Sequence, residues 1–176
     1  MSNLRDIKQR ITSVKKTQKI TLAMKMVAAA KFKRAQNRLK HAKVYGSFLQ
    51  NVFDDLANRL EPSDLPKLLV PNSSQRKAVL VITGDRGLCG GFNANILKKT
   101  RQYLSGQMSS DVDLYLFGNK GISAFKNKGY TIKKTFPNYI DDLNEESVYS
   151  LVESLVNLYQ DNEYGEIVLF YNEFIS

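Results

Sequence analysis

The stretch that decides the fold runs from residue 3 to residue 60: NLRDIKQRITSVKKTQKITLAMKMVAAAKFKRAQNRLKHAKVYGSFLQNVFDDLANRL. It contains no proline and a single glycine, Gly46. Because these two residue types cost most inside a helix, the stretch predicts one continuous helix. At 1.5 Å per residue such a helix is about 85 Å long, which exceeds the width of a globular domain.

Apolar residues recur along this helix with the spacing of a coiled coil. Counting alternately three and four residues from Leu4 gives a seam in which only Gln18, Thr21, Lys25 and Gly46 are not apolar. A seam of this period predicts a left-handed supercoil with another helix. No second stretch of comparable length follows. We therefore expect the mate to come from another chain, or from a part of the natural protein outside this sequence.

The apolar pattern shifts at residues 18–27. There the apolar side chains are Ile20, Ala23, Met24 and Val27, which lie off the seam. This shift predicts a local stutter, at which the helix turns toward something other than its coiled-coil mate.

Positive charge is concentrated in the same helix. Residues 1–60 hold 14 Lys and Arg against three Asp, whereas residues 61–176 hold 12 basic and 14 acidic side chains. The net charges are therefore +11 and −2. No acidic residue occurs between Asp6 and Asp54. We therefore expect an acidic partner for the helix.

The chain changes character after the helix. Residues 61–76 contain three of the four prolines, which predicts that the helix ends there in a stiff, irregular linker. Residues 77–176 then alternate between strand and helix patterns. The expected strands are 78–83, 112–117, 130–136 and 167–171, and the expected helices are 92–104, 120–126 and 145–160. The apolar side of the last helix is predicted to carry Val148, Leu151, Val152, Leu155 and Leu158.

This alternation predicts the fold class, which is α/β with an open, mostly parallel sheet and a long amino-terminal coiled-coil helix. The strand at 78–83 is apolar throughout and should be buried on both faces. The strand at 130–136 is more polar and should lie nearer an edge. The expected organisation is a basic coiled-coil helix at 1–60, a proline-containing linker at 61–76 and an α/β domain at 77–176.

A glycine-rich loop, GDRGLCGGFN at residues 84–93, follows the first expected strand. In α/β proteins this position binds phosphates. The spacing matches neither G-x-G-x-x-G nor a loop ending in Gly-Lys-Ser/Thr, which argues against a bound nucleotide. We favour a protein contact made through this loop over a tight structural loop with special backbone angles and an exposed Arg86. Nucleotide binding stays as the weakest of the three interpretations.

Composition offers little further chemistry. Cys89 is the only cysteine, which excludes an internal disulfide and fits a reducing compartment. The single histidine, His41, lies on the basic helix, so we expect Cys89 to be a small buried residue rather than a nucleophile. The acids at 141–146 indicate a helix amino terminus rather than a metal site. We expect no catalytic residue, no cofactor and no metal.

Membrane insertion and secretion are not expected either. No apolar run approaches the roughly 18 residues of a membrane span. The opening MSNLRDIKQR lacks the apolar core of a signal peptide. The sequence therefore predicts a soluble protein that is not secreted.

The basic helix also fits a nucleic-acid-binding protein. The heptads, however, run straight through the basic residues to Leu60, whereas a basic zipper separates the two regions. An acidic protein partner explains this overlap better than nucleic acid does. Nucleic-acid binding and a nucleotide-binding α/β enzyme stay as alternatives.

Several stretches resemble one family. Residues 17–31, TQKITLAMKMVAAAK, are similar to the amino-terminal helix of the γ subunit of F-type ATP synthase. The loop at 84–93 resembles the loop after the first strand of that subunit, and the opening LRDIKQRI at 4–11 also fits. The resemblance spans the whole chain.

The resemblance implies a central-stalk rotor without an active site. In that family the first helix pairs with a long carboxy-terminal helix inside a hexamer of α and β subunits. The α/β domain lies near the ε subunit and the membrane rotor ring. Proton flow turns the ring and the stalk, which drives the β subunits through their catalytic states. The expected location is peripheral, on the cytoplasmic face of a bacterial inner membrane or on the matrix side in a mitochondrion.

The resemblance also implies a partner interface. Its expected residues are Lys19, Met24 and Lys25 on the helix, near an acidic loop of β, and Arg86, Gly87, Leu88, Cys89 and Gly90 on the loop. The family's carboxy-terminal helix is missing from this sequence. The cysteine-containing insertion of chloroplast relatives is also missing, so thiol regulation is not expected.

Overall fold

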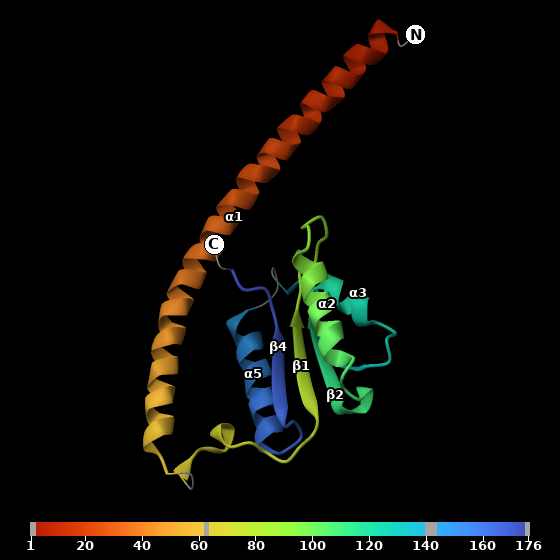
Figure 1. The fold of residues 1–176 in the computed structure, drawn as a ribbon. Helices are drawn as coiled ribbons and strands as arrows, with labels where there is room; N and C mark the ends of the chain where they lie inside the picture. The colour runs from red at the N-terminus through yellow and green to blue at the C-terminus, as the bar shows by residue number, and fades with distance from the viewer. Residues whose placement is uncertain (1–2, 62–63, 140–143, 175–176) are drawn as a thin grey trace. The chain divides into compact units, whose positions relative to one another are not determined.

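The structure is a computed structural model of the 176-residue chain, and it describes residues 3–61, 64–139 and 144–174. The chain divides into two compact units (Figure 1). The helical unit is Met1–Asp64 and the α/β unit is Leu65–Ser176.

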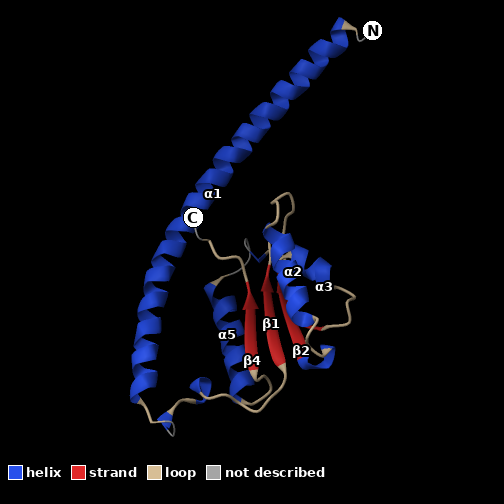
Figure 2. Cartoon of the chain, in the orientation of Figure 1, coloured by secondary structure: helices blue, strands red, loops and turns tan. Residues whose placement is uncertain are grey.

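The helical unit is dominated by a single helix, α1 (Leu4–Arg59), which runs without interruption (Figure 2). None of its side chains is buried, and among them only Leu39 and Leu49 are even partly covered. The long amino-terminal helix expected from the sequence is thereby confirmed. The helix ends as Leu60 takes an extended conformation, two residues before Pro62, because a proline disfavours helical angles in the residue preceding it.

The α/β unit is built on a four-stranded sheet with the order β3-β2-β1-β4, and its described strands all run parallel. The strands are β1 (Lys77–Ile82), β2 (Val112–Phe117), β3 (Thr131–Phe136) and β4 (Glu166–Phe170). The helices are α2 (Phe92–Leu104), α3 (Asn119–Phe125) and α5 (Glu145–Gln160), with short 3-10 turns η2 (Lys67–Leu69) and η3 (Ser109–Asp111). The expected α/β fold class is confirmed.

Helices cover both faces of this sheet (Figure 1). α2 and α3 pack on the face that carries Val79 and Leu114, whereas α5 packs on the face that carries Ala78 and Tyr115. Both faces of β1 and β2 are covered, and most residues of the two strands are apolar, although β2 contains Asp113. Every residue of β2 is buried.

The outer strands are less covered. β3 lies at one edge, as its polar sequence predicts, and β4 lies at the other edge, where Leu169 is exposed. Val148 and Val152, which the sequence pattern places on the apolar side of α5, are exposed as well. The reason is that α5 contacts the centre of the sheet through Leu151 and Leu155, and leaves the flank toward solvent uncovered.

Candidate functional site

The glycine-rich loop connects β1 to α2 at the carboxyl edge of the sheet (Figure 1). The chain order changes direction here, since β2 and β3 extend the sheet to one side of β1 and β4 lies on the other. In open α/β sheets this is the position at which ligands bind. The loop is therefore the first candidate for a binding site of the α/β unit.

Asn93, in the first turn of α2, fills the loop from inside. Its Oδ1 accepts the N–H of Gly84 at 2.7 Å, and its Nδ2 donates to the carbonyl oxygen of Arg86 at 3.2 Å. Asn93 is buried. A phosphate cradle offers such backbone N–H groups to its ligand, whereas here a side chain of the chain itself takes one of them. This arrangement argues against the nucleotide-binding alternative.

Asp85 fixes the base of the loop to the neighbouring strand ends. Its Oδ1 accepts the backbone N–H of Asn119 and that of Asn138, each at 2.9 Å. These two residues follow β2 and β3 respectively. One carboxylate oxygen therefore ties three consecutive strand ends together.

Thr83 and Gly118 pack closely beneath this tie. Thr83 Oγ1 donates to the carbonyl oxygen of Phe117 at 2.9 Å and accepts the N–H of Gly121 at 2.8 Å. Gly118 has a φ of 86°, and a side chain at this position would overlap the carbonyl oxygen of Thr83. The position requires glycine, so the base of the loop is held tightly.

The tip of the loop projects Leu88 into solvent. Leu88 has a φ of 61° and an exposure of 110%, and Arg86 and Gly87 beside it are also exposed. The left-handed conformation costs a leucine about 1–2 kcal/mol, so the surrounding contacts must hold it. A fixed base with an exposed apolar and charged tip is suited to contact with another protein.

Cys89 lies outside the core. The expectation that it is buried is wrong, because the left-handed turn at Leu88 directs the next residue into solvent. Its Sγ lies 3.2 Å from Nδ2 of Asn93, which donates to it.

The three expected interface residues of α1 are all exposed, but they do not share one face. The angle between successive residues of an α-helix is about 100°, so Lys19 and Met24 point about 140° apart and Met24 and Lys25 about 100° apart. Lys25 occupies a position on the seam itself. A single flat partner surface cannot contact all three side chains at once.

The threonine hydroxyl groups near residues 17–21 of the seam are satisfied within the helix. Thr21 Oγ1 donates to the carbonyl oxygen of Thr17 at 2.9 Å, and Thr17 Oγ1 donates to that of Ser13 at 3.1 Å. Because each hydroxyl is satisfied within the helix, the threonine methyl groups can contact a mate. At Thr21, which lies on the seam, the hydroxyl is therefore no obstacle to an apolar mate.

The structure groups the five expected loop residues at one tip, whereas the three expected helix residues belong to the other unit. Sequence reasoning missed Asp85 and Asn93, which shape the loop. Asp side chains in turns often accept hydrogen bonds from backbone N–H groups, so Asp85 was open to detection. The role of Asn93 depends on a contact nine residues away, which no local pattern reveals.

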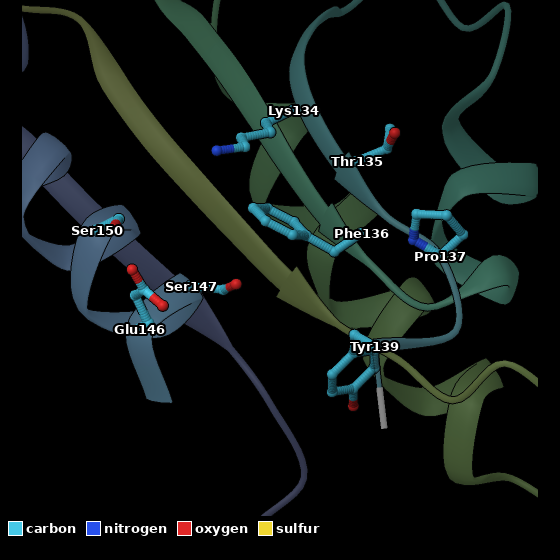
Figure 3. Close-up of a pocket in the computed structure, with 8 residues that line it drawn as sticks. All are labelled: Lys134, Thr135, Phe136, Pro137, Tyr139, Glu146, Ser147 and Ser150. Carbon is cyan, nitrogen blue, oxygen red and sulfur yellow. The ribbon is translucent and has the colours of Figure 1, made fainter. Parts of the chain in front are cut away.

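A cavity of about 500 Å³ lies elsewhere in the α/β unit, between β3 and the start of α5 (Figure 3). The residues that line it are Lys134, Thr135, Phe136, Pro137, Tyr139, Glu146, Ser147 and Ser150. Burial, helped by the Asp85 carboxylate, raises the pKa of Tyr139 above its ordinary value. None of the expected interface residues lines this cavity.

The acidic cluster at 141–146 is only partly described. Asp141 and Asp142 lie outside the described residues, and Glu145 and Glu146 lie in the first turn of α5. Within the part of the chain that the structure describes, no group of His, Cys, Asp and Glu is placed to hold a metal ion. Among the described helices, none is both long and apolar enough to cross a membrane.

Comparison with known proteins places the chain in a family. A family model described as ATP synthase matches residues 3–176. The chain belongs to this ATP synthase family. The resemblance to the γ subunit is confirmed as well, because the relatives described next carry the name ATP synthase gamma chain.

Two of these relatives are bacterial and one is chloroplastic. The gamma chain of Geobacter sp. (strain M21) is 39% identical over 178 residues, covering 100% of this chain and 61% of the relative. That of Chlorobium luteolum is 36% identical, covering 100% and 62%. The chloroplastic gamma chain of Trieres chinensis is 41% identical, covering 97% and 46%. The chain thus spans less than two thirds of the length of these relatives.

A solved structure shares the fold. It is the central stalk and c-ring of the Tetrahymena thermophila mitochondrial ATP synthase, and its matching chain is 24% identical with a TM-score of 0.65. The match covers 89% of this chain and 66% of that chain.

Proposed function

We propose that this chain is the central-stalk rotor subunit of an F-type ATP synthase. It couples proton translocation through the membrane ring to ATP synthesis in the β subunits, and it has no active site of its own. The observation that carries this proposal is α1, a 56-residue helix of an ATP synthase family member in which no side chain is buried. An apolar, basic helix of this length requires partners outside the helix itself.

The helix supports the proposal through its surface. Its seam takes a long mate, which in the gamma chains is a carboxy-terminal helix, and its acid-free surface suits acidic loops of the α and β hexamer. Lys19 and Met24 point in different directions. A partner surface therefore meets them one after another as the helix turns, which a rotor needs.

The loop provides the second proposed contact. Arg86 and Leu88 at the exposed tip meet a β subunit, together with Gly87, Cys89 and Gly90. The rest of the α/β unit lies near the ε subunit and the membrane ring. The protein is then peripheral, on the cytoplasmic face of a bacterial inner membrane or on the matrix side of a mitochondrial one.

The contact of α1 is tested at Met24, which is 67% exposed. A lysine there can form an ion pair with an acidic loop of β, and such a contact contributes about 1.5–3 kcal/mol where it is partly buried. A contact that deepens one rotational state raises the barrier for leaving it. Met24→Lys should therefore leave assembly intact and lower the number of protons pumped per ATP hydrolysed in membranes.

The control is Met24→Leu, which keeps the volume, adds no charge and should be nearly silent. Equal proton-to-ATP ratios for wild type and Met24→Lys would remove Met24 from the interface.

The loop is tested at Arg86. Arg86→Ala should lower ATP synthesis in the assembled complex while the α/β unit stays folded, because the side chain is exposed and the hydrogen bonds from Cys89 and Asn93 go to the main-chain carbonyl oxygen of Arg86. Unfolding of the α/β unit in this variant would instead assign Arg86 a structural role. Circular dichroism of the isolated chain separates the two results.

The +11 net charge of residues 1–60 is the observation that favours nucleic-acid binding as a second candidate. That function predicts DNA binding at physiological salt, with an affinity that falls steeply as salt rises. The rotor function predicts preference for an acidic protein hexamer over DNA under the same conditions.

A further inference from the structure

The segment Val70–Arg76 is fastened to the turn between α5 and β4. Tyr159 Oη donates to the carbonyl oxygen of Val70 at 3.0 Å. Asn72 Nδ2 donates to two carbonyl oxygens of the turn, that of Tyr159 at 2.9 Å and that of Tyr164 at 2.7 Å. Both hydrogens of one amide group are therefore used to hold the segment against the turn. We call Val70–Arg76 and its contacts with Tyr159–Gly165 the linker clamp.

The main chains of the linker clamp also pack directly against each other. Gly165 donates its N–H to the carbonyl oxygen of Arg76 at 2.8 Å, and Ser74 Oγ donates to that of Glu163 at 3.1 Å. A side chain at position 165 would overlap the carbonyl oxygen of Ser74, so only glycine permits this approach.

The far end of the linker clamp reaches the centre of the sheet. Arg76 Nη2 lies 2.6 Å from Oδ2 of Asp113 in β2, and Tyr164 Oη donates to the same oxygen at 2.8 Å. Asp113 is 1% exposed. Lys133 Nζ also lies 3.8 Å from the same oxygen. Because Arg76 makes the closest of these contacts to a buried carboxylate, detaching it is costly, and the cluster resists opening.

We propose that the linker clamp is the joint through which torque passes between the α/β unit and the chain that leads to α1. This inference rests on the proposed rotor function. A connection that rotated freely at every bond would let one unit turn while the other lagged. The linker clamp makes the chain from Val70 onward part of the α/β unit, and the turn η2 just before it also lies against α5. Asn72 acts as a positioning residue, because it holds the chain and touches no reacting group.

The chain offers a matched pair of asparagines for the test. In the wild type, Asn72 Oδ1 accepts the N–H of Ser74 at 3.0 Å, and an aspartate at this position can still accept it. The aspartate has no N–H group, however, so Asn72→Asp removes both hydrogen bonds that Nδ2 donates. Asn144 Oδ1 accepts the N–H of Ser147 at 2.8 Å as the cap of α5, which an aspartate also does. Asn144→Asp is therefore the control for the added charge.

Amide hydrogen exchange of the isolated chain tests whether the linker clamp exists. The amide of Gly165, which donates to the carbonyl oxygen of Arg76, should exchange about tenfold faster or more in Asn72→Asp, whereas that of Leu114 in β2 should be unchanged. Asn144→Asp should leave both amides as in wild type. Unchanged exchange at Gly165 in Asn72→Asp would overturn the linker clamp.

Proton pumping in membranes that carry the complete complex tests whether the linker clamp transmits torque. Asn72→Asp should assemble and hydrolyse ATP but pump at least about twofold fewer protons per ATP, while Asn144→Asp should match wild type. Equal pumping by Asn72→Asp, together with faster exchange at Gly165, would overturn the torque role. Failure of the rotor function itself would give another result. Wild-type complexes would then hydrolyse ATP without pumping protons, and the difference in amide exchange between wild type and Asn72→Asp would persist.

Discussion

The two units differ in whether their apolar helical side chains are buried, as two phenylalanines show. Phe125 at the end of α3 is 1% exposed and packs against the sheet, whereas Phe53 on the seam of α1 is 53% exposed. Both residues belong to an apolar pattern that predicts burial. In the α/β unit the chain supplies the partner surface itself, and along α1 it does not. The apolar pattern of α1 therefore describes contacts with a mate rather than contacts within the helical unit.

The largest expected effect comes from truncating these two side chains. Phe125→Ala should lower the free energy of unfolding of the α/β unit by about 3–5 kcal/mol, since it leaves a cavity in the core. Phe53→Ala should change the stability of the isolated chain by less than about 0.5 kcal/mol. Denaturant titration monitored by circular dichroism measures both. Similar losses for the two variants would mean that α1 is already covered in the isolated chain.

Glycine replacement should give effects of opposite sign in the two units. Gly118→Ala should destabilise the α/β unit by about 2–3 kcal/mol, because Gly118 has a φ of 86° and its α-carbon faces the carbonyl of Thr83. Gly46→Ala should raise the helicity of α1 by the equivalent of about 1 kcal/mol, since nothing lies within 4 Å of the added methyl group. Helicity at 222 nm and the melting temperature report the two changes. A loss of helicity in Gly46→Ala would show that α1 is packed at this position.

A smaller effect concerns alkaline pH and the α/β unit alone. Burial, helped by hydrogen bonds to Tyr115 and Asp113, raises the pKa of Tyr164 above its ordinary value of about 10. Above pH 10 the unfolded chain releases this proton while the folded chain keeps it. Stability is therefore full below that pH and should fall above it, by up to about 1.4 kcal/mol per pH unit.

Tyr164→Phe removes the titrating group and should flatten the alkaline slope. Urea titrations at a series of pH values above 9 make the measurement. An unchanged slope in Tyr164→Phe would assign the alkaline loss to other groups.

Much of the fold was predictable because the apolar residues of the α/β unit are buried by other elements of the same unit. Strands β1 and β2 are mostly apolar on both faces since helices cover both sides of the sheet, and α1 contains no proline and a single glycine. The pattern failed at Val148 and Val152, where apolar spacing does not reveal that the flank of α5 is uncovered. Periodicity indicates a face but not what covers it.

The candidate site was predictable in part. The loop at 84–93 stands out by its glycines, yet the exposure of Cys89 depends on the backbone turn at Leu88, which no residue pattern specifies. The linker clamp could not be predicted from the sequence, for a different reason. The contacts of Asn72 span 87 and 92 residues of sequence, so they follow from the tertiary fold alone.

Hydrogen exchange of the isolated chain, with and without a long heptad-patterned helix added in trans, tests whether α1 needs a helical mate. Amides along α1, such as that of Val27, should exchange much faster than that of Val79 in β1. The added helix should slow exchange along α1 and raise both helicity and melting temperature. A soluble monomer in which α1 alone is as protected as Val79 would contradict the claim that this helix needs a mate.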